Sequence, residues 1–467
     1  MKHASVHSRF AIRRLGLLAG TIVSVSTMSV LSPIVVAQPV AGKPAAVQFP
    51  STLAGRTAAA YIEAFNSGDR EKVRAFETSY RAASALADRP VEQRLERYEQ
   101  LRKDLGTLRV ESVQDGGPHD VALTVQSSAK GDWVVMSFEL EKVEPHRLIG
   151  IQLEISSQKP MSATPLDAAA RVEAIDAIAA ALANFYVFPE TGDKMAAAIR
   201  KSQASGAYDS LVTDAAFARK LTDDLRDICH DKHLAVRPGP IDPHRVHGGD
   251  DEAPTAEQVE AMRRENFAFR KTEILPGNIG YVKFDGFVGM KEAEPTAAAA
   301  MNFVANCDAL IIDLRENGGG DPVMINFLCG YLFDTPTLLN RFYNRPTDTT
   351  TESFSRGDVP GPRFGQTKPV YVLTSHYTFS GAEEFCYDLQ NLKRGVVVGE
   401  VTGGGAHPVS PRPAGPRFSV FVPYARAINP VTETNWEGKG IQPDIQATAA
   451  DALDAAVKAA SEKIAMQ

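Results

Sequence analysis

The sequence predicts a mixed α/β protein, in which an α/β core follows a helical segment and a small α+β domain. From about Gly277 onward, apolar strand-like runs alternate with stretches of helical periodicity. The runs 309–314 and 369–373 are almost continuously apolar, as expected of strands in a sheet that is buried on both faces. Nearer the N-terminus, helical periodicity gives way to several alternating strands, which is the pattern of an α+β domain.

The small α+β domain is predicted over residues 51–157. Its first helix carries Tyr61, Ile62 and Phe65 at helical spacing. Further helices are expected at 70–80 and 91–101, and strands at 108–113, 121–127, 133–141 and 148–155. The stretch YIEAFNSGD, with the later strands, resembles NTF2-like domains of the SnoaL type, which implies a cone-shaped fold. No acid/base pair is evident there, so we expect a binding or docking role.

The remaining elements follow a linker at 156–165. Helices are expected at 169–185, 192–202 and 214–229, and an exposed loop at 238–254. The core then alternates strand 279–284, helix 292–307, strand 309–314, helix 322–332, strand 369–373 and a helix from Ala382. A strand at 396–398, two strands within 417–428 and a closing helix from Ala449 complete it.

The composition is that of a soluble globular protein, with 44% apolar and 23% charged residues. A length of 467 residues predicts two to three domains. Arg9, Arg13 and Arg14 precede an apolar stretch at 15–36. This pattern predicts a secretory signal peptide cleaved near Ala37, and hence a periplasmic or secreted protein.

An uncleaved membrane anchor is the alternative, but several serines and Pro33 weaken this stretch as a stable span. Cleavage would remove four cations and no acids, so the net charge would change from −7 to −11. An acidic chain without a basic stripe is a poor candidate for binding nucleic acids or anionic membranes.

The four cysteines, Cys229, Cys307, Cys329 and Cys386, show no CxxC pattern. No zinc or other metal site is therefore expected, and no cofactor. The last three lie in apolar runs, which predicts core thiols even though export would permit disulfides.

Ser380 lies where the strand 369–373 leads into the helix from Ala382. Free backbone N–H groups and the positive end of the dipole at a helix start can stabilise an oxyanion, which suits a nucleophile. Ser380 and Glu383 also form a capping-box pattern, in which the serine only satisfies the first N–H groups. The cap is the commoner use of such a serine, so companions elsewhere must decide.

A glycine-rich turn, Asn317-Gly318-Gly319-Gly320, follows the buried strand 309–314. Glycines let backbone N–H groups approach a reacting centre closely. No Gly-Lys-Ser/Thr follows and the GxGxxG spacing is absent, so neither a P-loop nor a dinucleotide site is predicted. A plain strand-to-helix turn is the alternative.

Five motifs occur in order between residues 166 and 447: HDKHLAV, LIIDLRENGGGDP, TSHYTFSGAEEF, VVGEVTGGGAHP and NWEGKGIQPDI. Together they resemble peptidase family S41, which includes tail-specific (C-terminal-processing) proteases, tricorn cores and interphotoreceptor retinoid-binding protein modules. The resemblance implies a crotonase/ClpP-like α/β core with a helical N-terminal subdomain. The PDZ domain common in processing proteases is not expected, since only about 238–276 is available for it.

Under this resemblance Ser380 takes the nucleophile position. The backbone N–H groups of Gly381 and of the glycine turn, with Gly319 favoured, would form the oxyanion hole. The processing proteases use a lysine as base in a Gly-Lys-Gly motif, but Gly405 stands at that position. A Ser/Lys pair is therefore not available.

The tricorn-like branch takes its base from a histidine, which His233 matches, and an orienting carboxylate, which Glu437 matches. Lys232 stands where tricorn has a serine, which leaves a fourth member of the relay open. Glu437 could instead be a loop acid that pairs with Lys439. His230, His376 and His407 are rival bases, and both His376 and His407 are candidates for lining the substrate path.

The combination predicts an exported serine-type peptidase that cleaves peptide bonds of a peptide or protein substrate through Ser/His/Glu acyl-enzyme chemistry. A catalytically inactive module for apolar ligands is the alternative, because the retinoid-binding relatives use this fold that way. Acyl-CoA chemistry on the related crotonase fold is disfavoured by export. We expect no nucleic-acid partner and no stable membrane span after signal cleavage, and an oligomer remains open.

The expected segments are a signal peptide (1–37), a linker (38–50), the NTF2-like domain (51–157), the helical S41 N-terminal subdomain (166–240), the peptidase core (255–450) and a C-terminal helix (451–467).

Overall fold

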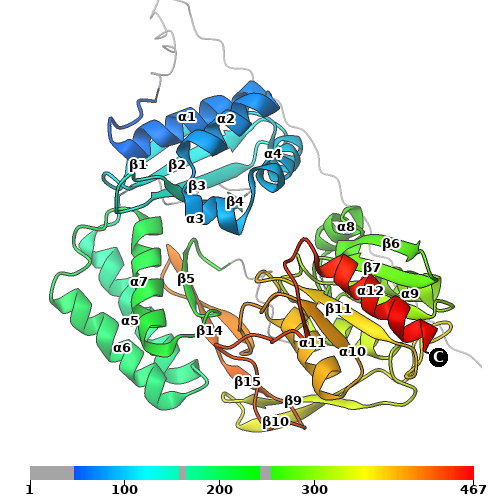
Figure 1. Ribbon diagram of the computed structural model, residues 1–467. Coiled ribbons are helices and arrows are strands. Elements are labelled where there is room, and N and C mark those ends of the chain that lie inside the picture. The colour runs from blue at the N-terminus through cyan, green and yellow to red at the C-terminus, as the bar shows by residue number, and fades with distance from the viewer. Residues whose placement is uncertain (1–46, 157–164, 242–253, 467) are drawn as a thin grey trace, which may run out of the picture. The chain divides into compact units, whose positions relative to one another are not determined.

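The computed structural model describes residues 47–156, 165–241 and 254–466 (Figure 1). The expected signal peptide, and most of the linker after it, lie outside these residues. So do most of the linker at 156–165 and most of the loop expected at 238–254. Within the described residues, none of the helices combines the length and the hydropathy that crossing a membrane requires.

The N-terminal α+β domain consists of four helices followed by a four-stranded sheet. The helices are α1 (Leu53–Ser67), α2 (Arg70–Tyr80), α3 (Ala83–Asp88) and α4 (Val91–Leu105). The antiparallel strands are β1 (Leu108–Asp115), β2 (Asp120–Ser127), β3 (Trp133–Leu140) and β4 (Leu148–Ser156), in the order β1-β2-β3-β4. The predicted order, helices followed by strands, is confirmed. Helix α3 was not expected, because it is too short to show a helical period. The NTF2-like resemblance stays a prediction.

A helical subdomain follows, with α5 (Ala168–Phe185), α6 (Pro189–Ala204) and α7 (Asp214–Cys229). It packs on a small antiparallel sheet in the order β13-β14-β5, made of β13 (Val409–Pro413), β14 (Phe418–Pro423) and β5 (Ala235–Pro238). Phe217 of α7 meets Phe418 of β14 with ring centroids 5.3 Å apart, inside a shared apolar cluster. This packing fixes the segment between α7 and β5 against the C-terminal part of the chain.

The peptidase-like core is built on a six-stranded sheet in the order β16-β12-β11-β8-β7-β6. Its strands are β6 (Phe269–Leu275), β7 (Ile279–Phe284), β8 (Ala309–Asp313), β11 (Val370–Thr374), β12 (Val396–Gly399) and β16 (Ile445–Gln446). Only β6 runs antiparallel to its neighbour. All five residues of β8 and of β11 are buried, as the continuous apolar runs predicted.

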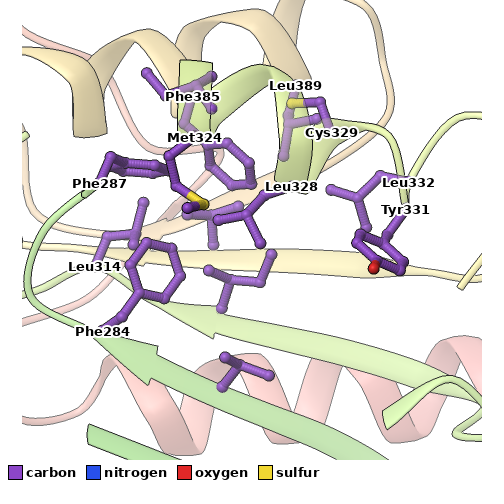
Figure 2. Close-up of a cluster of buried hydrophobic side chains, with 14 of the residues drawn as sticks. Phe284, Phe287, Leu314, Met324, Leu328, Cys329, Tyr331, Leu332, Phe385 and Leu389 are labelled. Atoms are coloured by element: carbon purple, nitrogen blue, oxygen red, sulfur yellow. The ribbon is translucent and has the colours of Figure 1, made fainter. Parts of the chain in front are cut away.

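Helices cover both faces of this sheet. The helices α9 (Glu294–Val304), α10 (Pro322–Cys329) and α11 (Gly381–Asn391) share the larger apolar cluster with one face. Figure 2 shows Met324 and Leu328 of α10 and Phe385 of α11 in this cluster, together with Phe284 at the end of β7. On the other face, α12 (Ala452–Ala465, red in Figure 1) buries a row of alanines against the strands. The core is therefore a three-layer α/β/α sandwich.

The sequence did not predict every element. It missed α8 (Ala256–Arg264), β6, β13 and a hairpin of β9 (Leu338–Asn344) and β10 (Thr349–Phe354). Strand β9 of this hairpin pairs with β15 (Ala425–Ile428). Short 3-10 turns at Asn266–Ala268 and Lys291–Ala293 were also missed. β10 reads TTTESF and is largely exposed, so it carries no apolar alternation from which a strand could be recognised.

Candidate active site

Three loops meet at one edge of the core sheet. β8, β11 and β12 are parallel neighbours, so their carboxyl ends lie at the same edge. The glycine turn at 317–320 leaves β8, the segment that ends in Ser380 leaves β11, and the 400–405 loop leaves β12. In open α/β sheets this edge is where ligands bind.

Ser380 occupies a strained position at the start of α11. Its φ of 55° and ψ of −123° lie outside the regions that residues with a side chain favour. Ser380 is the N-cap of α11 and forms a capping box with Glu383. The N–H of Ser380 donates to Glu383 Oε2 at 2.9 Å, while its partly buried hydroxyl contacts a different group.

His233 lies against Ser380, with 2.9 Å between His233 Nε2 and Ser380 Oγ. The backbone N–H of His233 donates to Asp231 Oδ1 at 3.0 Å, and its ring lies 4.7 Å from the ring of Phe379. Burial lowers the pKa of His233 to about 4. The imidazole is consequently neutral near pH 7 and able to accept a proton.

Gly405, which stands where the related proteases carry a lysine, leaves room for this histidine. A Cβ at Gly405 would lie 2.6 Å from His233 Cε1 and 2.3 Å from Phe379 Cζ, far inside normal contact distances. A side chain at position 405 and the imidazole of His233 would compete for the same space. The observed position of His233 therefore depends on a glycine at position 405.

Glu437 lies close to His233 but is not hydrogen-bonded to it. Among the described residues, His233 Nδ1 and Glu437 Oε1 are both buried and both lack a partner. One ligand atom each of Asp231, His233 and Glu437 lies within 4.8 Å of the others. Asp231 is the nearer acid, with its Oδ1 4.0 Å from His233 Nδ1, so neither carboxylate is hydrogen-bonded to that nitrogen and the expected contact with Glu437 stays a prediction.

His407 contacts both acids, Asp231 and Glu437. Its Nδ1 is 2.7 Å from Asp231 Oδ2 and 3.5 Å from Glu437 Oε2. Burial and, to a lesser extent, the charge of Asp231 raise the pKa of Glu437, His407 opposes the shift, and the resulting pKa is about 7. His407 is 4% exposed, and its expected place along the substrate path stays a prediction.

The two N–H groups expected to bind an oxyanion, those of Gly319 and Gly381, differ in whether they are already engaged. The N–H of Gly319 donates to Asn317 Oδ1 at 2.8 Å, so Gly319 has no free donor. The adjacent Gly320 is exposed, and its N–H, like that of Gly381, has no acceptor among the described residues. The Cβ position of Gly381 is 3.1 Å from Gly320 N, so these two N–H groups are neighbours. Gly319 instead supplies the close approach, because a Cβ there would lie 2.8 Å from Ser380 Cβ.

Glu383 ties the loops together, a role beyond the capping box that the sequence indicated. Its carboxylate accepts from the backbone N–H groups of Ser380 (2.9 Å), Gly404 (2.6 Å) and Gly405 (2.9 Å), and from the hydroxyl of Thr402. Lys232 adds a second tie, since its Nζ donates to the carbonyl of Gly403. Position N3 of α11 was the only signal that pointed to Glu383.

The other candidate histidines lie elsewhere. His230 is exposed at the left-handed C-cap of α7. The side chain of His376 is 48% exposed, and its Nδ1 is 3.0 Å from Glu400 Oε2. Asp231, His233 and Glu437 also have the residue types and the spacing of a candidate metal site.

A mixed α/β fold with a serine at a strained helix start and a neutral histidine against it defines the hydrolase class. The model for peptidase family S41 matches residues 278–447, and the model for the N-terminal domain of S41 peptidases in eukaryotic IRBP matches residues 168–276. The two matches adjoin and together take up more than half of the chain. The chain belongs to peptidase family S41, and is thereby a serine-type peptidase.

Individual relatives are more distant. The tricorn protease of Thermoplasma volcanium is 26% identical over 152 residues, which is 32% of this chain but only 13% of that protein. Among solved structures, a putative peptidase from Parabacteroides merdae has 18% identity and a TM-score of 0.42, covering 62% of this chain and 96% of its own. The photosystem II D1 C-terminal processing protease has 15% identity and a TM-score of 0.38, covering 60% and 93%. These TM-scores are too low to add to the family assignment.

Proposed function

We propose that the protein is an exported peptidase that cleaves peptide bonds through Ser380, His233 and Glu437. His233 Nε2 takes the proton of Ser380 Oγ as the oxygen attacks the scissile carbonyl carbon. The C–N bond then breaks, and the amine leaves with the proton from His233. A water molecule next hydrolyses the acyl ester by the same proton transfers in reverse, and frees the serine.

The observation that carries this proposal is the 2.9 Å contact between His233 Nε2 and Ser380 Oγ. A neutral buried imidazole and a serine in strained backbone are costly to maintain, and such costs concentrate at functional sites. A binding module for apolar ligands needs neither feature, so the alternative function is not favoured.

The oxyanion would bind between the N–H groups of Gly381 and Gly320. Gly381 N–H lies at the positive end of α11, where a developing negative charge is stabilised. Gly320 replaces Gly319 in this proposal, because the Gly319 N–H already donates to Asn317. The backbone of Gly320 is held in place on both sides by hydrogen bonds between Phe287 and its neighbours Gly319 and Asp321.

Glu437 would stabilise the imidazolium that forms during the reaction. Proton transfer to Nε2 makes His233 a cation, which attracts the buried carboxylate and draws Nδ1–H toward Oε1. Asp231 fixes the backbone of His233, and His407 holds Asp231 and Glu437 in place. Asp231 and His407 are thus positioning residues rather than groups that touch substrate.

The export part of the proposal rests on Arg9, Arg13 and Arg14 before the apolar stretch at 15–36. N-terminal sequencing of the protein secreted by its host should begin at Gln38. A protein that keeps residue 1 and stays in the cytoplasm would overturn this part alone.

A matched pair of histidine variants tests the peptidase proposal. His233→Ala should lower kcat for an unstructured protein substrate by about 10³-fold or more, because the base is lost. His376→Ala removes an equally sized ring from the loop before Ser380 and should keep activity within about threefold, since no proposed step uses it. Equal activity of His233→Ala and the wild type would refute the proposal.

A further inference from the structure

The N-terminal α+β domain contains a cavity of its own, unrelated to the site at Ser380. Its volume is about 360 Å³, and side chains from α1, α2, α4 and β4, together with Arg81 and Arg89, line it. The apolar part of its wall includes Phe65, Phe76, Leu101, Ile151 and Leu153. A space of this size admits a ligand of roughly ten to twenty non-hydrogen atoms.

The charged part of the lining is strongly unbalanced. Four arginines and a single acid, Glu77, face the cavity; the arginines are Arg81, Arg89, Arg94 and Arg97. Arg81 already binds both oxygens of Glu77, at 2.7 Å each, and Arg94 Nε is 3.9 Å from the same carboxylate. Arg94 also donates to the backbone carbonyls of Arg89 and Ala85, which leaves its Nη1 for a ligand. Neither Arg89 nor the exposed Arg97 forms an ion pair with a described residue. The charged side chains of the lining therefore carry a net charge of +3 (four arginines and one glutamate).

Tyr61 adds a donor that the protein leaves unused. Tyr61 is 9% exposed and lines the cavity, and no described residue is hydrogen-bonded to its hydroxyl. The hydroxyl is not among the fully buried unpaired atoms, so it is accessible to a ligand in the cavity. Glu77 and Arg81 interact electrostatically with this tyrosine, so the unused donor lies at the charged end of the cavity.

We propose that this cavity binds an apolar carboxylate, with the carboxylate near Arg94, Arg97 and Tyr61 and the apolar body against the phenylalanine and leucine wall. Guanidinium groups pair with planar carboxylates through two parallel hydrogen bonds, and tyrosine can donate a third. A free aliphatic acid and the C-terminus of a peptide ending in an apolar residue share this chemistry. The proposal is independent of peptidase activity.

Titration calorimetry with the full chain carrying Ser380→Ala, which prevents cleavage of the probes, tests it. One arm uses decanoate against decanamide, and the other uses acetyl-Ala-Ala-Leu with a free carboxylate against the same peptide amide. At least one carboxylate should bind about tenfold or more tightly than its amide. Binding of decanoate alone assigns the site to free acids, and binding of the peptide alone assigns it to C-termini.

Three variants locate the site. Arg97→Gln and Tyr61→Phe should each weaken carboxylate binding by about threefold to tenfold, because each removes one donor and little packing. Arg74→Gln removes a cation of the same domain outside the cavity lining and should leave the affinity unchanged. The proposal is overturned if neither carboxylate binds below about 5 mM, if amides bind equally well, or if Arg74→Gln weakens binding as much as Arg97→Gln.

Discussion

Two glutamates, the buried Glu383 and the partly buried Glu437, lie near the Ser380–His233 pair, and they differ in how their oxygens are satisfied. Glu383 accepts three backbone N–H groups and one hydroxyl. Glu437 accepts only the N–H of Ala406, at 2.6 Å, and among the described residues its Oε1 has no hydrogen-bond partner. Burial raises the pKa of both carboxyls, and that of Glu437 reaches about 7.

The difference separates a structural acid from a responsive one. A carboxylate surrounded by donors is held in one place and joins the elements that supply those donors. A carboxylate with an unsatisfied oxygen can take up a new partner when one becomes charged. We therefore assign Glu383 to building the site and Glu437 to the reaction in it.

The largest effect is expected at Glu383. Glu383→Ala leaves the N–H groups of Ser380, Gly404 and Gly405 without their acceptor, so the free energy of unfolding should fall by about 3 kcal/mol or more. Activity should fall with it, because the loop that faces His233 loses its anchor. Urea unfolding and peptide hydrolysis measure the two quantities. A stable but inactive variant would mean that Glu383 also acts in the chemistry.

Glu437→Gln should separate activity from stability. Without the carboxylate, the imidazolium of His233 is no longer stabilised, and kcat should fall by about 10³-fold. Below about pH 4.5, where Glu437 is protonated in both folded and unfolded states, the free energy of unfolding should change by less than about 1 kcal/mol, because only one hydrogen bond to Glu437 is affected. Full activity in this variant would remove Glu437 from the mechanism.

The pH profile sharpens the same assignment. Since the pKa of Glu437 is about 7 and that of His233 about 4, kcat should rise with pH near 7, as Glu437 ionises. This limb should vanish in Glu437→Gln. Because the pKa of Glu437 is higher in the folded state than in the unfolded state, the folded wild type loses free energy of unfolding as pH rises from about 4.5 through 7. Glu437→Gln has no such group, so the wild type should become less stable relative to this variant over the same pH range.

His407 should have the smallest effect of the series. His407→Gln keeps a polar side chain beside Asp231 but removes the ring that lowers the pKa of Glu437. The midpoint of the activity limb should therefore move to higher pH, and for a shift of about one unit kcat at pH 7 should fall by about fivefold. An unchanged midpoint would show that His407 has only a structural role.

The sequence predicted the parts of the site that have local patterns. Ser380 stands out because a strand changes to a helix there, and the resemblance to S41 added His233 and Glu437. The α/β core was also predictable, because β8 and β11 are continuous apolar runs. These features depend on residues that are close together in the chain or that carry a family motif.

The rest depends on contacts that no local pattern records. The link between Asp231 and His407 joins residues 176 positions apart, and no spacing rule connects them. The choice between Gly319 and Gly320 as oxyanion donor depends on Asn317. Its side chain accepts a hydrogen bond from the N–H of Gly319 and none from the N–H of Gly320. The hairpin β9–β10 was missed for another reason, because its exposed polar residues carry no alternation.

The most direct test of the central claim is labelling with a fluorophosphonate, which reacts with an activated serine. Mass spectrometry should locate the phosphonyl group on Ser380 in the wild type, with no labelling of Ser380→Ala and a labelling rate at least about 10²-fold lower in His233→Ala. His376→Ala should label at the rate of the wild type. Absence of labelling in the folded wild-type protein, or labelling at Ser380 that is independent of His233, would contradict the account.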